Sequence, residues 1–161
     1  MLYCFQVIDM SNYICNSGIS LHDCRATNIE TDANRLRLVF PDGVWLLADN
    51  SLNTVGKTVR TGRAEVLLRD FALEALTVYQ PVRLFGKTLL TVCREVSLKT
   101  LRENVNSTKQ TVEFIDDFEN ADSHLFRVVL RQKEKRYDGL LEVRYTDAEY
   151  HFDRIEKDRV W

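Results

Sequence analysis

Alternation of apolar and polar residues runs through much of this chain and predicts a protein built from short β-strands. The densest apolar stretch covers residues 36–48, LRLVFPDGVWLLA, where Pro41-Asp42-Gly43 suits a type I turn closed by a glycine bulge. A hairpin folded at this turn has one apolar face that must be buried, made of Leu36, Leu38, Phe40, Val44, Leu46 and Ala48. Its other face carries Val39, Trp45 and Leu47. That face is too apolar for open water, and we predict that another element or a protein partner covers it.

Further strands are expected on both sides of this hairpin. Residues 2–8 are predicted to form an opening strand, and residues 22–48 a three-stranded meander that includes the hairpin. The stretch 63–79 fits either the apolar stripe of a helix or two strands, and we favour two strands because its neighbours are predicted strands. Pro81 marks a sheet edge or a bend, and residues 89–96 are predicted to be a buried strand.

One helix and two more hairpins complete the predicted elements. Ser97 is a suitable N-cap for a helix over residues 97–106, with Leu98, Leu101 and Val105 on one face. The second hairpin pairs residues 111–118 with 125–130, and the third pairs 140–145 with 150–155. The predicted fold class is mostly β, with about eight to ten strands and one short helix in an antiparallel sandwich or a curved, barrel-like sheet. Residues 1–161 are predicted to form a single domain.

The composition of the chain indicates which kinds of binding partner and which cellular compartment to expect. The chain is 45% hydrophobic and 29% charged, which is ordinary for a globular protein. A net charge of −2 provides no global attraction to nucleic acid or to an anionic membrane, so neither partner is expected. No basic leader or membrane-spanning apolar run is evident, and we expect a soluble, cytoplasmic protein. The four cysteines have no Cys-x-x-Cys spacing and are predicted to be reduced thiols.

Two short clusters combine residue types that can carry chemistry. His22, Asp23 and Cys24 offer an imidazole, a carboxylate and a thiol, but on a strand Asp23 would point away from the other two. His151 and Asp153 would share one face of the last predicted strand and are compatible with a hydrogen-bonded pair or with two metal ligands. We interpret both clusters as structural, and we predict no catalytic, metal-binding or cofactor-binding site.

A combination of short motifs resembles small bacterial β-rich domains of unassigned function, some of which are immunity-protein-like. The motifs are Leu21-His22-Asp23-Cys24, the charged strand pair that follows, Phe40-Pro41-Asp42-Gly43 and the single helix over 97–106. The resemblance covers about half of the chain and implies a β-rich fold, and it transfers no functional residue.

The leading functional hypothesis is a non-enzymatic protein-interaction domain, because motifs for chemistry are absent while Trp45 and Leu47 are available. Its partner would be another protein, with a homo-oligomer as an alternative. A second hypothesis is a small-ligand-binding β domain whose pocket is lined by aromatics such as Phe40, Phe85 and Tyr145. A third is a hydrolase or thiol enzyme that uses His22 and Cys24.

Overall fold

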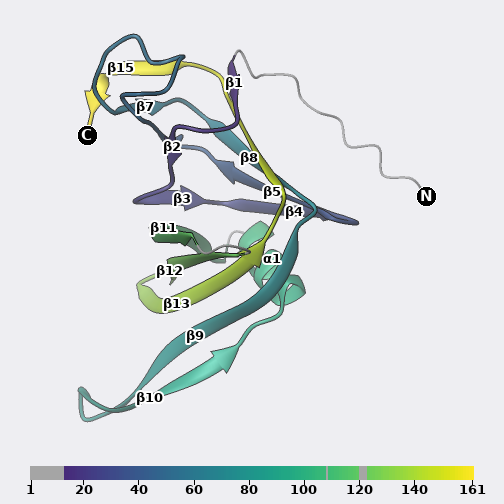
Figure 1. Cartoon of the computed structure of the whole chain (residues 1–161). Helices are drawn as coiled ribbons and strands as arrows, with labels where there is room; N and C mark the ends of the chain where they lie inside the picture. The colour runs from purple at the N-terminus through teal and green to yellow at the C-terminus, as the bar shows by residue number, and fades with distance from the viewer. Residues whose placement is uncertain (1–12, 108, 120–122) are drawn as a thin grey trace.

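Three antiparallel sheets and one short helix make up the fold, shown in Figure 1. The computed structural model describes residues 13–107, 109–119 and 123–161. The mostly β fold class and the single short helix are therefore confirmed, and none of the three sheets closes on itself. The predicted opening strand at 2–8 lies outside the described residues. Within the described residues, the one helix is too short to cross a membrane.

The strands divide among the sheets as follows, each in spatial order. The five-stranded sheet contains β1 (Tyr13–Cys15), β14 (Asp147–Phe152), β8 (Ala64–Arg69), β5 (Arg35–Phe40) and β4 (Asn28–Asp32). The six-stranded sheet contains β10 (Lys87–Glu95), β9 (Ala72–Leu84), β13 (Lys135–Arg144), β12 (His124–Gln132), β11 (Thr111–Glu119) and β3 (Cys24–Ala26). The four-stranded sheet contains β15 (Ile155–Val160), β7 (Val59–Thr61), β6 (Trp45–Leu46) and β2 (Ile19–Ser20).

The main core lies between the five- and six-stranded sheets, which are drawn one above the other in Figure 1. Phe40 of β5 meets Phe114 of β11 with ring centroids 5.7 Å apart, and Phe126 of β12 packs edge-on against Phe114 at 5.2 Å. Edge-to-face aromatic pairs of this kind add to the free energy gained by burying the rings. The chain passes between the two sheets at one side, from β8 to β9 and from β13 to β14 (Figure 1).

The central turn forms, but the predicted hairpin around it is wrong. The Gly43 N–H donates to the carbonyl of Phe40 at 3.1 Å, and Gly43 has a φ of 80°. At this turn the chain changes sheet: β5 pairs with β4 and β8, whereas β6 pairs with β2 and β7. Val44 is held by Thr61 of β7, whose hydroxyl accepts from the Val44 N–H at 2.9 Å. Five of the six residues of the predicted apolar face are nevertheless buried, and the exception is Ala48.

The third predicted hairpin and part of the predicted meander are also wrong. Strands β13 and β14 lie in different sheets, and Thr146 between them bonds to the chain where β8 ends. Its N–H donates to the carbonyl of Arg69 at 3.0 Å, and its hydroxyl donates to the Asp70 carboxylate at 2.7 Å. In the meander, β4 and β5 pair as expected, but β3 pairs with β11 of the six-stranded sheet.

Three other local predictions are confirmed. Residues 63–79 contain the two strands β8 and β9, and the second hairpin is β11 with β12. Helix α1 (Leu98–Asn106) begins after Ser97, whose hydroxyl accepts from the Thr100 N–H at 3.2 Å. Leu101 and Val105 are buried on its inner face. Cys15, Cys24 and Cys93 are free thiols, and Cys4 lies outside the described residues.

Candidate functional site

A two-stranded arm extends from the six-stranded sheet and is the most exposed apolar feature of the described chain. Strand β13 pairs with β9 only as far as Tyr79, so from Gln80 onward β9 pairs with β10 alone. We call residues 80–92 the arm, which reaches away from the rest of the fold in Figure 1. Its turn consists of Phe85 and Gly86 with φ values of 50° and 78°. These values are typical of a tight two-residue hairpin turn, and glycine adopts them readily whereas phenylalanine does so at a cost.

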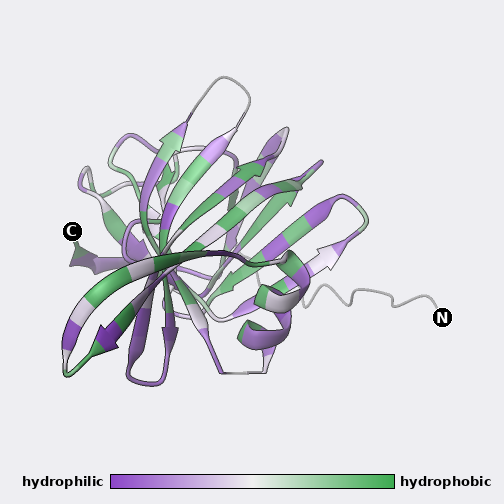
Figure 2. Ribbon diagram, turned by 90° about the horizontal axis from the view of Figure 1, so that it is seen from below, coloured by the Kyte–Doolittle hydropathy of each residue, from purple (hydrophilic) through white to green (hydrophobic). Residues whose placement is uncertain are grey.

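Apolar side chains share one face of the arm. Residues that are directly opposite in an antiparallel pair lie on the same face, and the register pairs Val82 with Leu90. Buried Val78 lies on the same face of β9, so the arm continues the core-facing side of the sheet into solvent. The apolar face is made of Val82, Leu84, Leu90 and Val92, each between 39% and 53% exposed. Phe85 at the tip is 95% exposed, and hydrophobic stretches run along both strands of the arm in Figure 2.

Strand β10 is the second distinctive part of the arm, because it is an edge strand. It forms one edge of the six-stranded sheet, and all nine of its residues are exposed. The prediction of a buried strand at 89–96 was therefore right about the strand and wrong about its burial. A run of β-branched and apolar residues does not distinguish a core strand from an uncovered edge. No charged residue lies between Thr88 and Cys93, although charges are a common protection for exposed edges.

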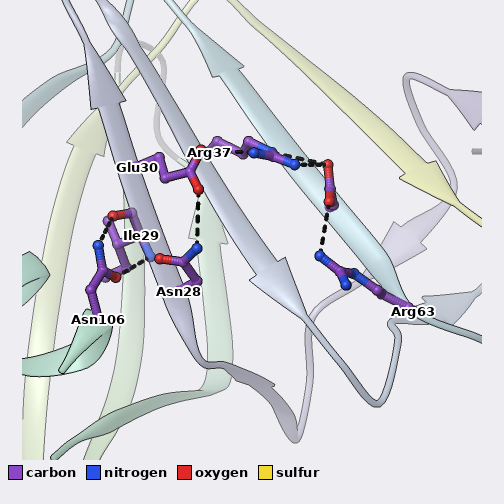
Figure 3. Close-up of polar contacts among 7 residues, drawn as sticks. Asn28, Ile29, Glu30, Arg37, Arg63 and Asn106 are labelled. Atoms are coloured by element: carbon purple, nitrogen blue, oxygen red, sulfur yellow. Dashed lines mark hydrogen bonds and ion pairs between the residues drawn. The ribbon is translucent and has the colours of Figure 1, made fainter. Parts of the chain in front are cut away.

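In contrast to β10, the edge strand β4 of the five-stranded sheet is covered by another element of the chain. Helix α1 lies beside it, and the Asn106 side chain both accepts from the Ile29 N–H and donates to the Ile29 carbonyl, each at 2.8 Å. Figure 3 shows this amide in the place that a neighbouring strand would take. The fold thus covers the β4 edge with its own helix and leaves the β10 edge open.

The interaction surface predicted at Val39, Trp45 and Leu47 is not an open surface. Val39 is only 5% exposed, because β5 lies between β4 and β8 instead of at a hairpin edge. Trp45 is half-buried: its ring lies 5.3 Å from that of Trp161, and the Arg60 guanidinium stacks over it at 4.7 Å. Leu47 is also half-buried. Elements of the chain itself therefore cover most of this predicted surface.

His22, Asp23 and Cys24 form a turn whose three side chains have separate roles. Asp23 has a φ of 54°, and β3 begins only at Cys24. The His22 ring stacks on Trp161 with centroids 5.1 Å apart, while its Nδ1–H donates to the Ile115 carbonyl. Cys24 is fully buried, its thiol lies 3.4 Å from the His22 carbonyl oxygen, and burial raises its pKa to about 11. A thiol nucleophile needs the opposite shift, so the geometry does not favour the thiol-enzyme hypothesis.

His151 and Asp153 do not form the pair that their spacing allowed. His151 in β14 bonds through Nε2 to Glu149 at 3.2 Å, and Asp153 lies beyond the end of β14 and pairs with Arg154 at 2.9 Å. Arg69 also bonds to Glu149, at 2.9 Å, and this contact holds the pKa of the Glu149 carboxyl below its usual value. Among the described residues, no group of three or more histidine, cysteine or acidic side chains is placed to hold a metal ion.

Ion pairs cover the solvent-facing side of the five-stranded sheet near His151. Arg37 of β5 lies between two carboxylates, donating to Glu30 at 2.7 Å and to Glu65 at 2.6 Å (Figure 3). Asn28 and Arg63 extend this network at its two ends. The arginines and glutamates pair with one another across β4, β5 and β8. We interpret this face as a structural, solvated surface.

A cavity of about 340 Å³ lies between the five- and six-stranded sheets. Its apolar wall comes from β5 and β8 on one side and from β11, β12 and β13 on the other, and includes Leu38, Leu68, Phe126 and Leu141. Of the three aromatics predicted to line a pocket, only Tyr145 does so. Phe40 packs against Phe114 in the core, and Phe85 is at the tip of the arm.

Comparisons of this chain with protein-family models, curated proteins and solved structures found no match. The resemblance to immunity-like domains therefore stays a prediction. The sequence did not predict the arm, and it predicted an aromatic-lined pocket of which Tyr145 alone lines the cavity. The signal for the arm was the uncharged stretch from Thr88 to Cys93 directly after a tight turn, and the cavity has no local signal because distant strands build it.

Proposed function

We propose that this chain is a protein-interaction domain that docks through its arm, and that the partner on the arm is a second copy of the chain. The observation that carries the proposal is the exposed apolar face of the arm beside the uncovered edge of β10. A long edge strand with an uncharged centre is a template for pairing with another strand, and main-chain hydrogen bonds along such an edge supply affinity.

The sequence of β10 suits pairing with itself. In an antiparallel pair centred on Thr91, Leu90 of each copy lies opposite Val92 of the other. A bulge between Thr88 and Leu90 places Lys87 and Glu95 on opposite faces of the strand, so their side chains do not meet in this register. The strand is complementary to its own reverse through its uncharged centre from Thr88 to Cys93, where Leu90 and Val92 share one face.

Two-fold pairing would also remove the exposed edge from both copies at once. A closed, isologous contact of this kind uses the same surface on both partners. The apolar faces of the two arms would then lie side by side in one continuous sheet, with Val82 and Leu84 flanking the central Leu90 and Val92. This arrangement explains why an apolar arm extends so far from the core.

Light scattering coupled to size-exclusion chromatography tests the proposal. The chain has a mass of 18.8 kDa, and we expect the wild-type protein to elute with twice that mass and to dissociate on dilution. A Leu90→Ser/Val92→Ser variant should elute as a folded monomer, because it removes the apolar contact without touching the core. The matched control is Thr88→Ser/Thr91→Ser, which places the same residues on the other face and should remain dimeric. A wild-type protein that stays at 18.8 kDa at every concentration would overturn the proposal.

A further inference from the structure

The cavity between the two large sheets has an apolar end and a polar end. Its inner wall is made of buried side chains such as Leu38, Val66 and Val143. Its open end is lined by Trp161, which is 60% exposed, and by Asp117, whose side chain is 52% exposed. At about 340 Å³ it lies at the lower end of the range typical of small-molecule sites, which is roughly 300 to 1,000 Å³.

The charged side chains that line the cavity are acidic. No lysine or arginine is among its lining residues, and the two carboxylates are Asp116 and Asp117. Asp116 already pairs with Arg127 at 3.0 Å. Asp117 lies 3.6 Å from Nδ1 of the His124 ring, and among the described residues it has no ion pair with a lysine or arginine. Asp117 is therefore the lining carboxylate that is open to a permanent cation.

Two tyrosines face the same carboxylate. Burial raises the pKa of Tyr150 to about 12 and also raises that of Tyr145, and the charge of Asp117 contributes to both shifts. Burial also raises the pKa of Asp117 itself, with His124 opposing the shift. A carboxylate that is partly removed from water in this way is stabilised by a nearby positive charge.

We propose that this cavity binds a small organic amine with an apolar body. The ammonium group lies against the Asp117 carboxylate, and the apolar body fills the space between the leucines and valines of the two sheets. The aromatic rings of Tyr145, Tyr150 and Trp161 line the same cavity and attract a cation through their negative faces. A carboxylate or phosphate ligand of the same shape is disfavoured, because it would meet two carboxylates and no lysine or arginine among the lining residues, where His22 is the one basic side chain.

Isothermal titration calorimetry with a matched pair of probes tests this proposal on the unmodified protein. The first probe is 2-(1-naphthyl)ethylamine, and the second is 3-(1-naphthyl)propanoate, which has the same ring and the opposite charge. We expect the amine to bind about tenfold or more tightly than the carboxylate, which corresponds to one charge-assisted contact. Amide chemical-shift changes on adding the amine should be centred on β11 and on residues 19–22.

Two variants identify which carboxylate binds the ammonium group of the amine. Asp117→Asn should weaken binding of the amine by about tenfold, whereas Asp116→Asn should change it little because that carboxylate is already paired. The amide spectrum of each variant shows that it is folded. The proposal is overturned if the amine does not bind, if both probes bind equally, if Asp117→Asn leaves the amine affinity unchanged, or if the shifts are centred on the arm.

Discussion

At the scale of single residues, the buried thiol of Cys24 links the stability of the fold to pH. Burial is the main cause of its raised pKa, about 11 against an ordinary value of 9.0, and the Arg60 guanidinium partly opposes it. Between these two values the unfolded chain loses the thiol proton while the folded chain keeps it. Unfolding therefore becomes easier as the pH rises through this range.

We predict that the free energy of unfolding falls between about pH 9 and pH 11, with Cys24 contributing up to ~1.4 kcal/mol for each pH unit. Urea denaturation at a series of pH values measures this slope. Cys24→Ala should make the slope shallower, whereas Cys93→Ala, at an exposed position, should leave it unchanged. If the free energy of unfolding falls equally steeply with pH in the wild type and in Cys24→Ala, the Cys24 thiol is not the cause of the pH dependence. Burial also raises the pKa of Tyr150, so some dependence of stability on pH remains in Cys24→Ala.

The second prediction about single residues concerns Leu46 and Leu47, which follow the central turn. Leu46 is fully buried in β6, whereas Leu47 is half-buried and outside the strand. Leu46→Ala should lower the free energy of unfolding by about 2 to 5 kcal/mol, because it removes buried methylenes and leaves a cavity. Leu47→Ala should cost clearly less. Chemical denaturation of the two variants side by side checks this, and equal losses would contradict the burial that distinguishes them.

At the scale of elements, the edges of the sheets distinguish structural from functional strands. The β4 edge is satisfied within the chain by the side chain of Asn106 from α1. The β10 edge has no such cover among the described elements. An edge that the chain covers contributes to folding, and an edge that it leaves open is available for association.

Removing the amide of Asn106 should loosen the contact between α1 and β4. We predict that Asn106→Ala lowers the free energy of unfolding by about 1 to 2 kcal/mol, since two hydrogen bonds to Ile29 are lost. Lys99→Ala, an exposed change on the same helix, should have little effect and serves as the control. Amide hydrogen exchange gives a local measurement, and the Ile29 N–H should exchange faster in Asn106→Ala. Unchanged protection of that amide would argue against this role of Asn106.

Local pattern was enough to predict many elements but not which strands pair. Alternation located β11 and β12, the neighbouring predicted strands favoured β8 and β9 over a helix, and the capping serine located α1, because these signals depend on residues close in sequence. The predicted turns at 41–43 and 146–149 look like hairpin turns locally, yet the chain changes sheet at or next to both. Sheet partners are fixed by the packing of the whole core, which one sequence pattern does not contain.

At the scale of the whole molecule, the two features proposed to bind lie apart from each other in the fold. The cavity is built by strands of all three sheets and residues between them, whereas the arm consists only of the outer parts of β9 and β10. The sequence predicted that another element or a partner covers the face with Val39, Trp45 and Leu47, and this face was the candidate interaction surface. In the folded chain Trp161 and Arg60 cover that ring, and the apolar surface that remains open is on the arm.

The central claim is that β10 pairs with β10 of a second copy about Thr91, and a charge pair introduced at the centre of the strand tests it most directly. Leu90→Glu and Val92→Lys each bring a charge opposite an apolar residue of the second copy, whereas the double variant brings Glu opposite Lys, twice by symmetry. Sedimentation velocity over a dilution series measures the dimer dissociation constant. We predict that each single variant weakens the dimer by on the order of tenfold or more and that the double variant dimerises more tightly than either single variant. A double variant that dimerises as weakly as the single variants, or a wild-type protein that is monomeric throughout, would contradict this account.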